Sequence, residues 1–247
     1  MEQGLAALGY FQLADWLALI LLGVAWIGSG LLIEHPPERR RSTSWLMAGF
    51  RREWMQVFVA RDPRIFDSQI VGNLRQGTAF LASASMIAIG GGFALIGNAD
   101  LLRGVAADLV STAPPVVIWE LKLLLMLVFA VNAFLKFVWS HRLFGYCAVL
   151  MASVPNDPAD PGAYPRAAQA GEINVTAARS YNRGLRSVYF GIASGAFLVG
   201  TLPLVLATLA TLIVVLRREF ASDSREVLLK AAPTRKSDET ARGEGVR

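Results

Sequence analysis

Charged residues are scarce in this sequence. Only 17% of its 247 residues are charged, whereas 54% are hydrophobic. A soluble domain carries about 25% charged residues, which cover its surface. The composition, with a mean hydropathy of +0.44, therefore argues against a soluble globular protein and favours a chain whose solvent is largely bilayer hydrocarbon.

Cysteine and histidine are rarer still. The single cysteine, Cys147, excludes an intramolecular disulfide framework. The two histidines, His35 and His141, fall at the ends of apolar blocks, whereas paired haem ligands usually lie inside a helical core. We therefore expect no metal site and no cofactor.

Signatures of catalysis and of nucleic-acid binding are missing as well. The chain has no Walker loop, no GxSxG or HExxH motif and no cysteine pair. Its net charge of +5 comes without a recognisable nucleic-acid-binding module. The pattern leans away from an enzyme, and we expect the basic residues to face lipid headgroups rather than nucleic acid.

The hydrophobic residues that are present collect in four blocks, at about 13–33, 78–97, 113–139 and 187–216. About 20 apolar residues suffice for a helix to cross a bilayer core of about 30 Å. The sequence predicts an all-α, polytopic membrane helical bundle over residues 1–216, with about four transmembrane helices. Residues 217–247 form a polar tail that we expect to be disordered.

A further helix is predicted to be amphipathic and cytoplasmic. Between Ser42 and Ala60, one helical face carries large apolar residues, namely Leu46, Met47, Phe50, Trp54, Val57 and Phe58. Such a helix lies in the headgroup plane of the membrane, or it packs over the end of the bundle. The sequence leaves both arrangements open.

The distribution of Lys and Arg predicts an orientation. Eight lie between the first two blocks and five between the last two, but only Arg103 lies between the second and the third. Basic loops stay in the cytoplasm, which places the N-terminus outside. Four single crossings would then place the tail, with eight basic residues, outside against the same rule. We expect the single crossing, with a reversal at Pro203 as the alternative.

Several polar residues fall inside the predicted spans. On the third span, Lys122, Asn132 and Lys136 share one helical face with Ser140, while Glu120 points away. This face is either a polar path through the bundle or a set of interhelical and interfacial groups. Asp15 would lie level with Lys122 and could pair with it. The intramembrane polar candidates are Asp15, Glu120, Lys122 and Asn132.

A second group of polar residues is expected at the cytoplasmic ends of the spans. Its arginines could bind lipid phosphate or a carboxylate through forked hydrogen bonds. Alternatively, they could form ion pairs with Asp62, Asp67 and Glu172 that lock the ends of the helices together. The candidate cytoplasmic cluster comprises Arg61, Asp62, Arg64, Asp67, Gln69, Asn73, Lys136, Arg142, Arg179, Asn182, Arg183 and Arg186.

Three segments resemble a known family. They read RDPRIFDSQIVGNLRQGTAFLASAS (Arg61 to Ser85), KFVWSHRLFGY (Lys136 to Tyr146) and ARSYNRGLRSVYF (Ala178 to Phe190). They are similar to the uncharacterised membrane family catalogued as domain of unknown function 599, found in bacteria and plants. The resemblance covers roughly residues 12–216. It implies a helical membrane protein and carries over no activity and no catalytic residue.

Three function classes remain for a multi-pass protein that we expect in a bacterial inner membrane. The first is a non-enzymatic accessory or scaffold protein that binds a membrane protein partner, another copy of itself or anionic lipid headgroups. The second is an oligomeric transporter or channel that uses the polar face of the third span. The third is an enzyme that acts on a lipid headgroup with Asp62, Asp67, Arg183 and Arg186. The missing catalytic motifs favour the first.

Overall fold

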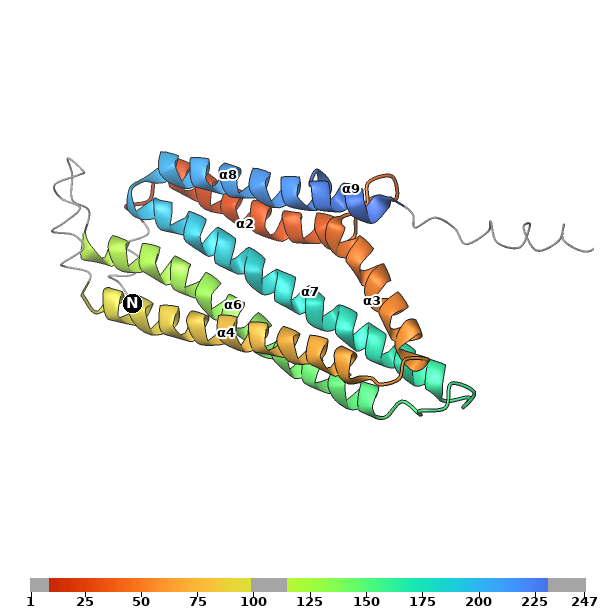
Figure 1. Ribbon diagram of the computed structural model, residues 1–247. Coiled ribbons are helices and arrows are strands. Elements are labelled where there is room, and N and C mark those ends of the chain that lie inside the picture. Colours follow the sequence, from red (N-terminus) through yellow and green to blue (C-terminus); the bar gives the residue numbers. More distant parts are fainter. Residues whose placement is uncertain (1–8, 99–114, 231–247) are drawn as a thin grey trace, which may run out of the picture.

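The computed structural model describes residues 9–98 and 115–230. Every regular element in this part of the chain is a helix (Figure 1). Four segments are long and apolar enough to cross a membrane: α2 (Leu13–Glu34), α4 (Ile65–Ile96), α6 (Val116–Ala152) and Thr201–Leu229, which begins with α8 (Thr201–Phe220). The predicted all-helical membrane bundle is therefore confirmed.

The long helices pack side by side in a fixed order. α4 packs on α6, α6 packs on α7 (Ala163–Gly195), and α7 contacts both α2 and α8, which pack on each other (Figure 1). α3 (Thr43–Val59) leaves the end of α2 and crosses α7 obliquely. α2 and α4 thus lie on opposite sides of the α6–α7 pair.

Two predicted spans continue as helices beyond their apolar blocks. α4 has 32 residues and α6 has 37, which correspond to about 48 and 55 Å of helix. A bilayer core of about 30 Å accommodates only part of these lengths. The surplus, residues 65–77 and 140–152, joins the first half of α7 in a helical extension beyond the end of α2, and α3 packs on it.

The fourth block is not one helix, so the expected single crossing of residues 187–216 is wrong. α7 ends at Gly195, a 3-10 turn η1 (Ala196–Leu198) follows, and the chain reverses at Gly200 before α8. Gly200 has φ = 153°, a conformation that side chains with a Cβ avoid. Pro203 lies in the first turn of α8, where its missing N–H leaves no hydrogen bond unmade.

This reversal makes α7 run the whole length of the bundle. At one end Thr201 donates a hydrogen bond to Asp15 at the start of α2, and at the other the Ser44 hydroxyl donates to Glu219 near the end of α8. α2 and α8 are therefore parallel, and α7 returns between them. Because only its last part, from Ser187 onward, is free of charge, α7 is not among the four segments that are apolar enough to cross a membrane.

The start of the predicted tail is also ordered. Residues 217–220 belong to α8, and a short helix, α9 (Asp223–Leu229), follows. The expectation of disorder from residue 217 is therefore wrong up to Lys230, while residues 231–247 lie outside the described part. α9 stays close to α3, because Arg225 donates a hydrogen bond to the carbonyl oxygen of Arg41.

α3 packs over the helical extension, as one of the two predicted arrangements requires. Met55, Phe58 and Val59 are buried, and Met55 lies against Gly171 of α7. The residues of the predicted apolar face are not all buried. Phe58 is buried, whereas Met47, Phe50 and Val57 are exposed.

Candidate functional site

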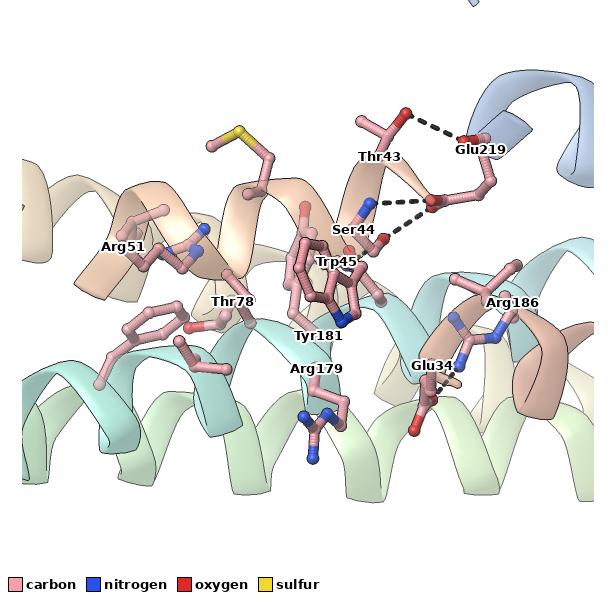
Figure 2. A pocket seen from close by; sticks show the side chains of 18 of the residues that line it. Glu34, Thr43, Ser44, Trp45, Arg51, Thr78, Arg179, Tyr181, Arg186 and Glu219 are labelled. Atoms are coloured by element: carbon pink, nitrogen blue, oxygen red, sulfur yellow. Dashed lines mark hydrogen bonds and ion pairs between the residues drawn. The ribbon is translucent and has the colours of Figure 1, made fainter. Parts of the chain in front are cut away.

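A cavity of about 540 Å³ lies where α2 and α8 end and the helical extension begins. α3 covers it, α7 forms its base, and the end of α2 and the middle of α4 form its sides. Figure 2 shows the side chains of Arg51, Trp45 and Arg179 around this space, with the pair of Glu34 and Arg186 at one end. We call it the α3 pocket.

Arginine is the dominant charge in the α3 pocket. Its lining contains the four arginines Arg51, Arg52, Arg179 and Arg186 and the two glutamates Glu34 and Glu219. Two of the arginines are paired: Arg186 with Glu34 at 2.5 Å, and Arg52 with Glu172 at 2.5 Å. Within the described residues, neither Arg51 nor Arg179 has a carboxylate oxygen within 4.0 Å.

Arg51 is held in place without being neutralised. Its Nη1 donates to Oδ1 of the buried Asn174 at 2.5 Å. Burial lowers the pKa of Arg51 from its ordinary value, but an arginine remains protonated at neutral pH. A partly buried cation that lacks a counterion is costly. The position therefore favours a bound anion.

The two glutamates of the pocket are already engaged. Glu219 accepts hydrogen bonds from the backbone N–H and the hydroxyl of Ser44, at 2.9 and 2.7 Å. Glu34 accepts from both Arg183 and Arg186. Asn182 donates to the Ser44 hydroxyl at 3.2 Å. These bonds tie the start of α3 to α7 and α8, and they leave neither carboxylate free to neutralise Arg51 or Arg179.

A second polar cluster closes the far tip of the extension. Asp67 is buried, and its Oδ1 accepts hydrogen bonds from Trp54 Nε1 at 2.6 Å and from Arg61 at 2.5 Å. Arg64 donates to the backbone carbonyls of Val59, Val154 and Pro155. These bonds join the α3–α4 turn to the end of α6, while Asp67 Oδ2 is buried without a hydrogen-bond partner among the described residues.

The predicted cytoplasmic cluster is thus divided among several places. Asn73, Arg179, Asn182 and Arg186 line the α3 pocket. Arg61, Arg64 and Asp67 lie at the tip, Arg183 pairs with Glu34, and Arg142 donates to Tyr146 on the exposed side of α6. Asp62 and Gln69 are exposed, and Lys136 is half-buried.

Sequence reasoning did not include Arg51, Ser44, Glu34 and Glu219 in this site. Arg51 could have been singled out from the sequence, because it places a charge among the apolar residues on one face of α3. Glu34 could have been as well, because it is the first charge after an uninterrupted apolar block.

The polar residues of α6 form a seam with α7. Asn132 donates to the Ser187 hydroxyl at 2.6 Å, and Ser140 donates to the carbonyl oxygen of Ala177 at 2.8 Å. Phe137, which is fully buried, separates these bonds. Asn132 and Ser140 are therefore used in contacts between α6 and α7, as the interhelical alternative for this face requires.

The expected pair of Asp15 and Lys122 is not formed. The Lys122 ammonium lies 4.5 Å from the centre of the Phe197 ring. Asp15 accepts instead from the backbone N–H of Gln12 and from the Thr201 hydroxyl. Glu120 is half-buried on the same turn of α6 as Lys122.

The residues that could bind a metal do not converge in the described part of the chain, where no group of three His, Cys, Asp or Glu side chains is placed to hold an ion. His141 Nδ1 lies 3.2 Å from the carbonyl oxygen of Arg75. His35 lines the α3 pocket on the other side of α7.

Comparisons with known proteins give one result. No curated protein and no solved structure matches the chain. A family described as "Protein of unknown function, DUF599" matches residues 17–224, a range that includes every residue lining the α3 pocket.

Proposed function

The chain belongs to the DUF599 family of proteins of unknown function, and from its geometry we propose that it is a non-enzymatic membrane protein that binds an anionic group in the α3 pocket. In this role it serves as an accessory or scaffold protein. The family description supplies no activity, so the proposal depends on the residues of this chain.

One observation carries the proposal. Arg51 and Arg179 line the same cavity, and within the described residues neither has a carboxylate partner. Guanidinium groups bind phosphate and carboxylate through short, charge-assisted hydrogen bonds. A cavity of about 540 Å³ is within the range that holds small ligands. A phosphate-bearing group would supply a counterion for the partly buried Arg51, and Arg179, which is exposed and close enough to Glu172 to help lower its pKa, would add a second guanidinium.

The charge distribution supports a cytoplasmic location for the pocket. Because α8 returns, the basic residues of 35–64, of the helical extension and of the α8–α9 end all lie at one end of the bundle (Figure 1). The other end of the described bundle has no Lys or Arg beyond Lys122. Basic segments stay in the cytoplasm, and the conflict raised by four single crossings disappears.

This topology makes a prediction about labelling. In a Cys147→Ala background, a cysteine introduced by Ser222→Cys should react with a membrane-impermeant maleimide only in inverted vesicles. One introduced by Asn98→Cys should react only in right-side-out vesicles. Asn98 is exposed just after α4, and Ser222 is half-buried between α8 and α9, so the reactivity of each cysteine reports the side of the membrane on which it lies. Labelling of both from the same side would contradict the fold-back of α8.

A binding measurement tests the proposed function. We expect detergent-purified protein to bind glycerol 3-phosphate, and the variant with Arg51→Gln and Arg179→Gln to bind it at least about 100-fold more weakly. Each charge-assisted hydrogen bond contributes about 1.5–3 kcal/mol, and 1.4 kcal/mol is a factor of ten in affinity. Titration calorimetry or ³¹P line broadening would measure the change.

The matched control for this experiment is Arg142→Gln. Arg142 is also an arginine of the extension, but it is exposed on α6 and bonds only to Tyr146 in the described structure. Its replacement should leave the affinity unchanged. Equal binding by the double variant and the wild type would contradict the proposal, as would an equal loss in the Arg142 variant.

A further inference from the structure

We infer that the group bound in the α3 pocket belongs to an anionic phospholipid of the adjacent leaflet, which enters sideways between α2 and α4. This inference rests on the proposed function and adds the class of ligand and its route. It follows from the depth of the pocket, from the helices that close it and from the residues left free inside it.

The depth of the pocket is set by two helices of membrane length. α2 has 22 residues and α8 has 20, about 33 and 30 Å of helix, which matches a bilayer core of about 30 Å. The pocket is lined by their final residues, Ile33, Glu34 and Glu219. The edge of the pocket that these residues form therefore lies at the level where hydrocarbon ends and headgroups begin.

Helix packing does not close the pocket between α2 and α4, and we take this gap as its opening toward the membrane. α3 runs from the end of α2 across α7 to the start of α4, where Trp54 bonds to Asp67 (Figure 1). α2 and α4 do not pack on each other, because α6 and α7 lie between them. The α4 side of this opening contains Gly77 and Thr78. A Cβ built on Gly77 meets no atom within 4 Å.

The free groups inside the pocket favour an anionic headgroup over a zwitterionic one. Arg51 and Arg179 are available to a phosphodiester, and Asn73 lies on the same lining. An ammonium group would need a free carboxylate, but Glu34 and Glu219 already accept hydrogen bonds from arginine and serine. A phosphatidylglycerol-type headgroup, with hydroxyls in place of the ammonium, meets these conditions.

The aromatic and basic residues beside the opening suit a headgroup layer. Trp45 lines the pocket and is 40% exposed, and the Arg41 guanidinium lies 3.9 Å from the centre of its ring. Trp and Arg are typical of the membrane–water interface. With the phosphate in the α3 pocket, the acyl chains remain in the bilayer along the apolar half of α4.

The test places a larger side chain at the opening and leaves the arginines of the pocket unmutated. Wild type, Gly77→Trp and Gly77→Leu are reconstituted in nanodiscs of phosphatidylcholine with a minority of phosphatidylglycerol, and native mass spectrometry counts the lipids that stay bound. We expect one retained phosphatidylglycerol per wild-type chain, and a loss of retention of about tenfold in Gly77→Trp, with a smaller loss in Gly77→Leu.

Gly72→Trp is the matched control. Gly72 lies on the same helix, a Cβ there also meets no atom within 4 Å, and it is not part of the pocket lining. This variant should retain the lipid. Glycerol 3-phosphate, which can reach the pocket from the aqueous side, should bind to Gly72→Trp as it does to the wild type.

The outcomes separate the two proposals. Retention of phosphatidylglycerol by Gly77→Trp at the wild-type level would overturn lateral entry. Equal retention of phosphatidylcholine and phosphatidylglycerol by the wild type would overturn the anionic lipid. If glycerol 3-phosphate binds but no lipid is retained, only the further inference fails. If neither binds, the proposed function fails with it.

Discussion

Adding one methyl group at Gly184 is expected to destabilise the protein by about 2–3 kcal/mol, the upper range for an overpacked core. A Cβ at this position would lie 2.6, 2.9 and 3.0 Å from three atoms of the Phe137 ring. Phe137 is fully buried, so its ring has little room to move away. The packing of α7 on α6 depends on this contact.

The measurement is the unfolding of Gly184→Ala in detergent, by heat or by SDS titration, beside Gly72→Ala. Gly72 is open to its surroundings, and alanine is favoured over glycine in a helix by about 1 kcal/mol. Gly72→Ala should therefore be as stable as the wild type or more so. If Phe137→Leu is added to Gly184→Ala, the two changes should couple and part of the loss should be recovered. Equal stability of the two alanine variants would contradict this packing.

Replacing Glu34 with glutamine is expected to cost about 3–5 kcal/mol, the range for breaking a buried ion pair. Glu34 accepts from Arg183 and Arg186, and its side chain is 10% exposed. The Arg186 side chain is 7% exposed, so the substitution leaves this cation buried beside a neutral amide. The loss should appear as a lower unfolding midpoint and as weaker attachment of α2 to α7.

Glu172→Gln is the control for that experiment. Glu172 also pairs with an arginine, Arg52, and this bond lowers the pKa of Glu172. Both side chains are exposed, at 59% and 50%, and an exposed pair contributes at most about 1 kcal/mol. Equal losses of stability in the Glu34→Gln and Glu172→Gln variants would contradict the burial of the pair between Glu34 and Arg186.

The first span shows what the sequence could predict. The predicted block at 13–33 is α2, Leu13–Glu34, because a block of this length with no charge after Asp15 is stable in hydrocarbon as a helix and Glu34 ends it. The same argument from hydropathy predicts the apolar parts of α4 and α6. It does not show where those helices end, because the extension is stabilised by helix–helix contacts, such as the Asp67 cluster, that hydropathy does not record.

The fourth block shows the limit of that reasoning. Residues 187–216 carry no charge, and hydropathy does not distinguish a long helix from two antiparallel ones. The reversal depends on the positive φ of Gly200. Arg183 and Arg186, which pair with Glu34, also make this part of α7 too polar to be predicted as a membrane helix from hydropathy.

The sequence predicted that arginines would gather near the ends of the spans, but it predicted their positions only in part, and the ligand stays a prediction. Arginines near the span ends suggested a phosphate or carboxylate ligand, and Arg179 and Arg186 do line the α3 pocket. Arg51 could not be assigned to it, because its position depends on how α3 crosses α7 and on the bond to Asn174. A contact between residues more than a hundred positions apart produces no periodic pattern in the sequence.

The most direct test of the α3 pocket as an anionic-lipid site is the distance from a lipid phosphorus to the guanidinium nitrogens of Arg51, measured by ³¹P–¹⁵N solid-state NMR in bilayers that contain phosphatidylglycerol. Direct hydrogen bonding predicts a distance within about 5 Å, lost in Arg51→Gln and in bilayers of phosphatidylcholine alone. If the phosphorus signal showed no dephasing by Arg51 in the wild type, the pocket would not hold a lipid phosphate.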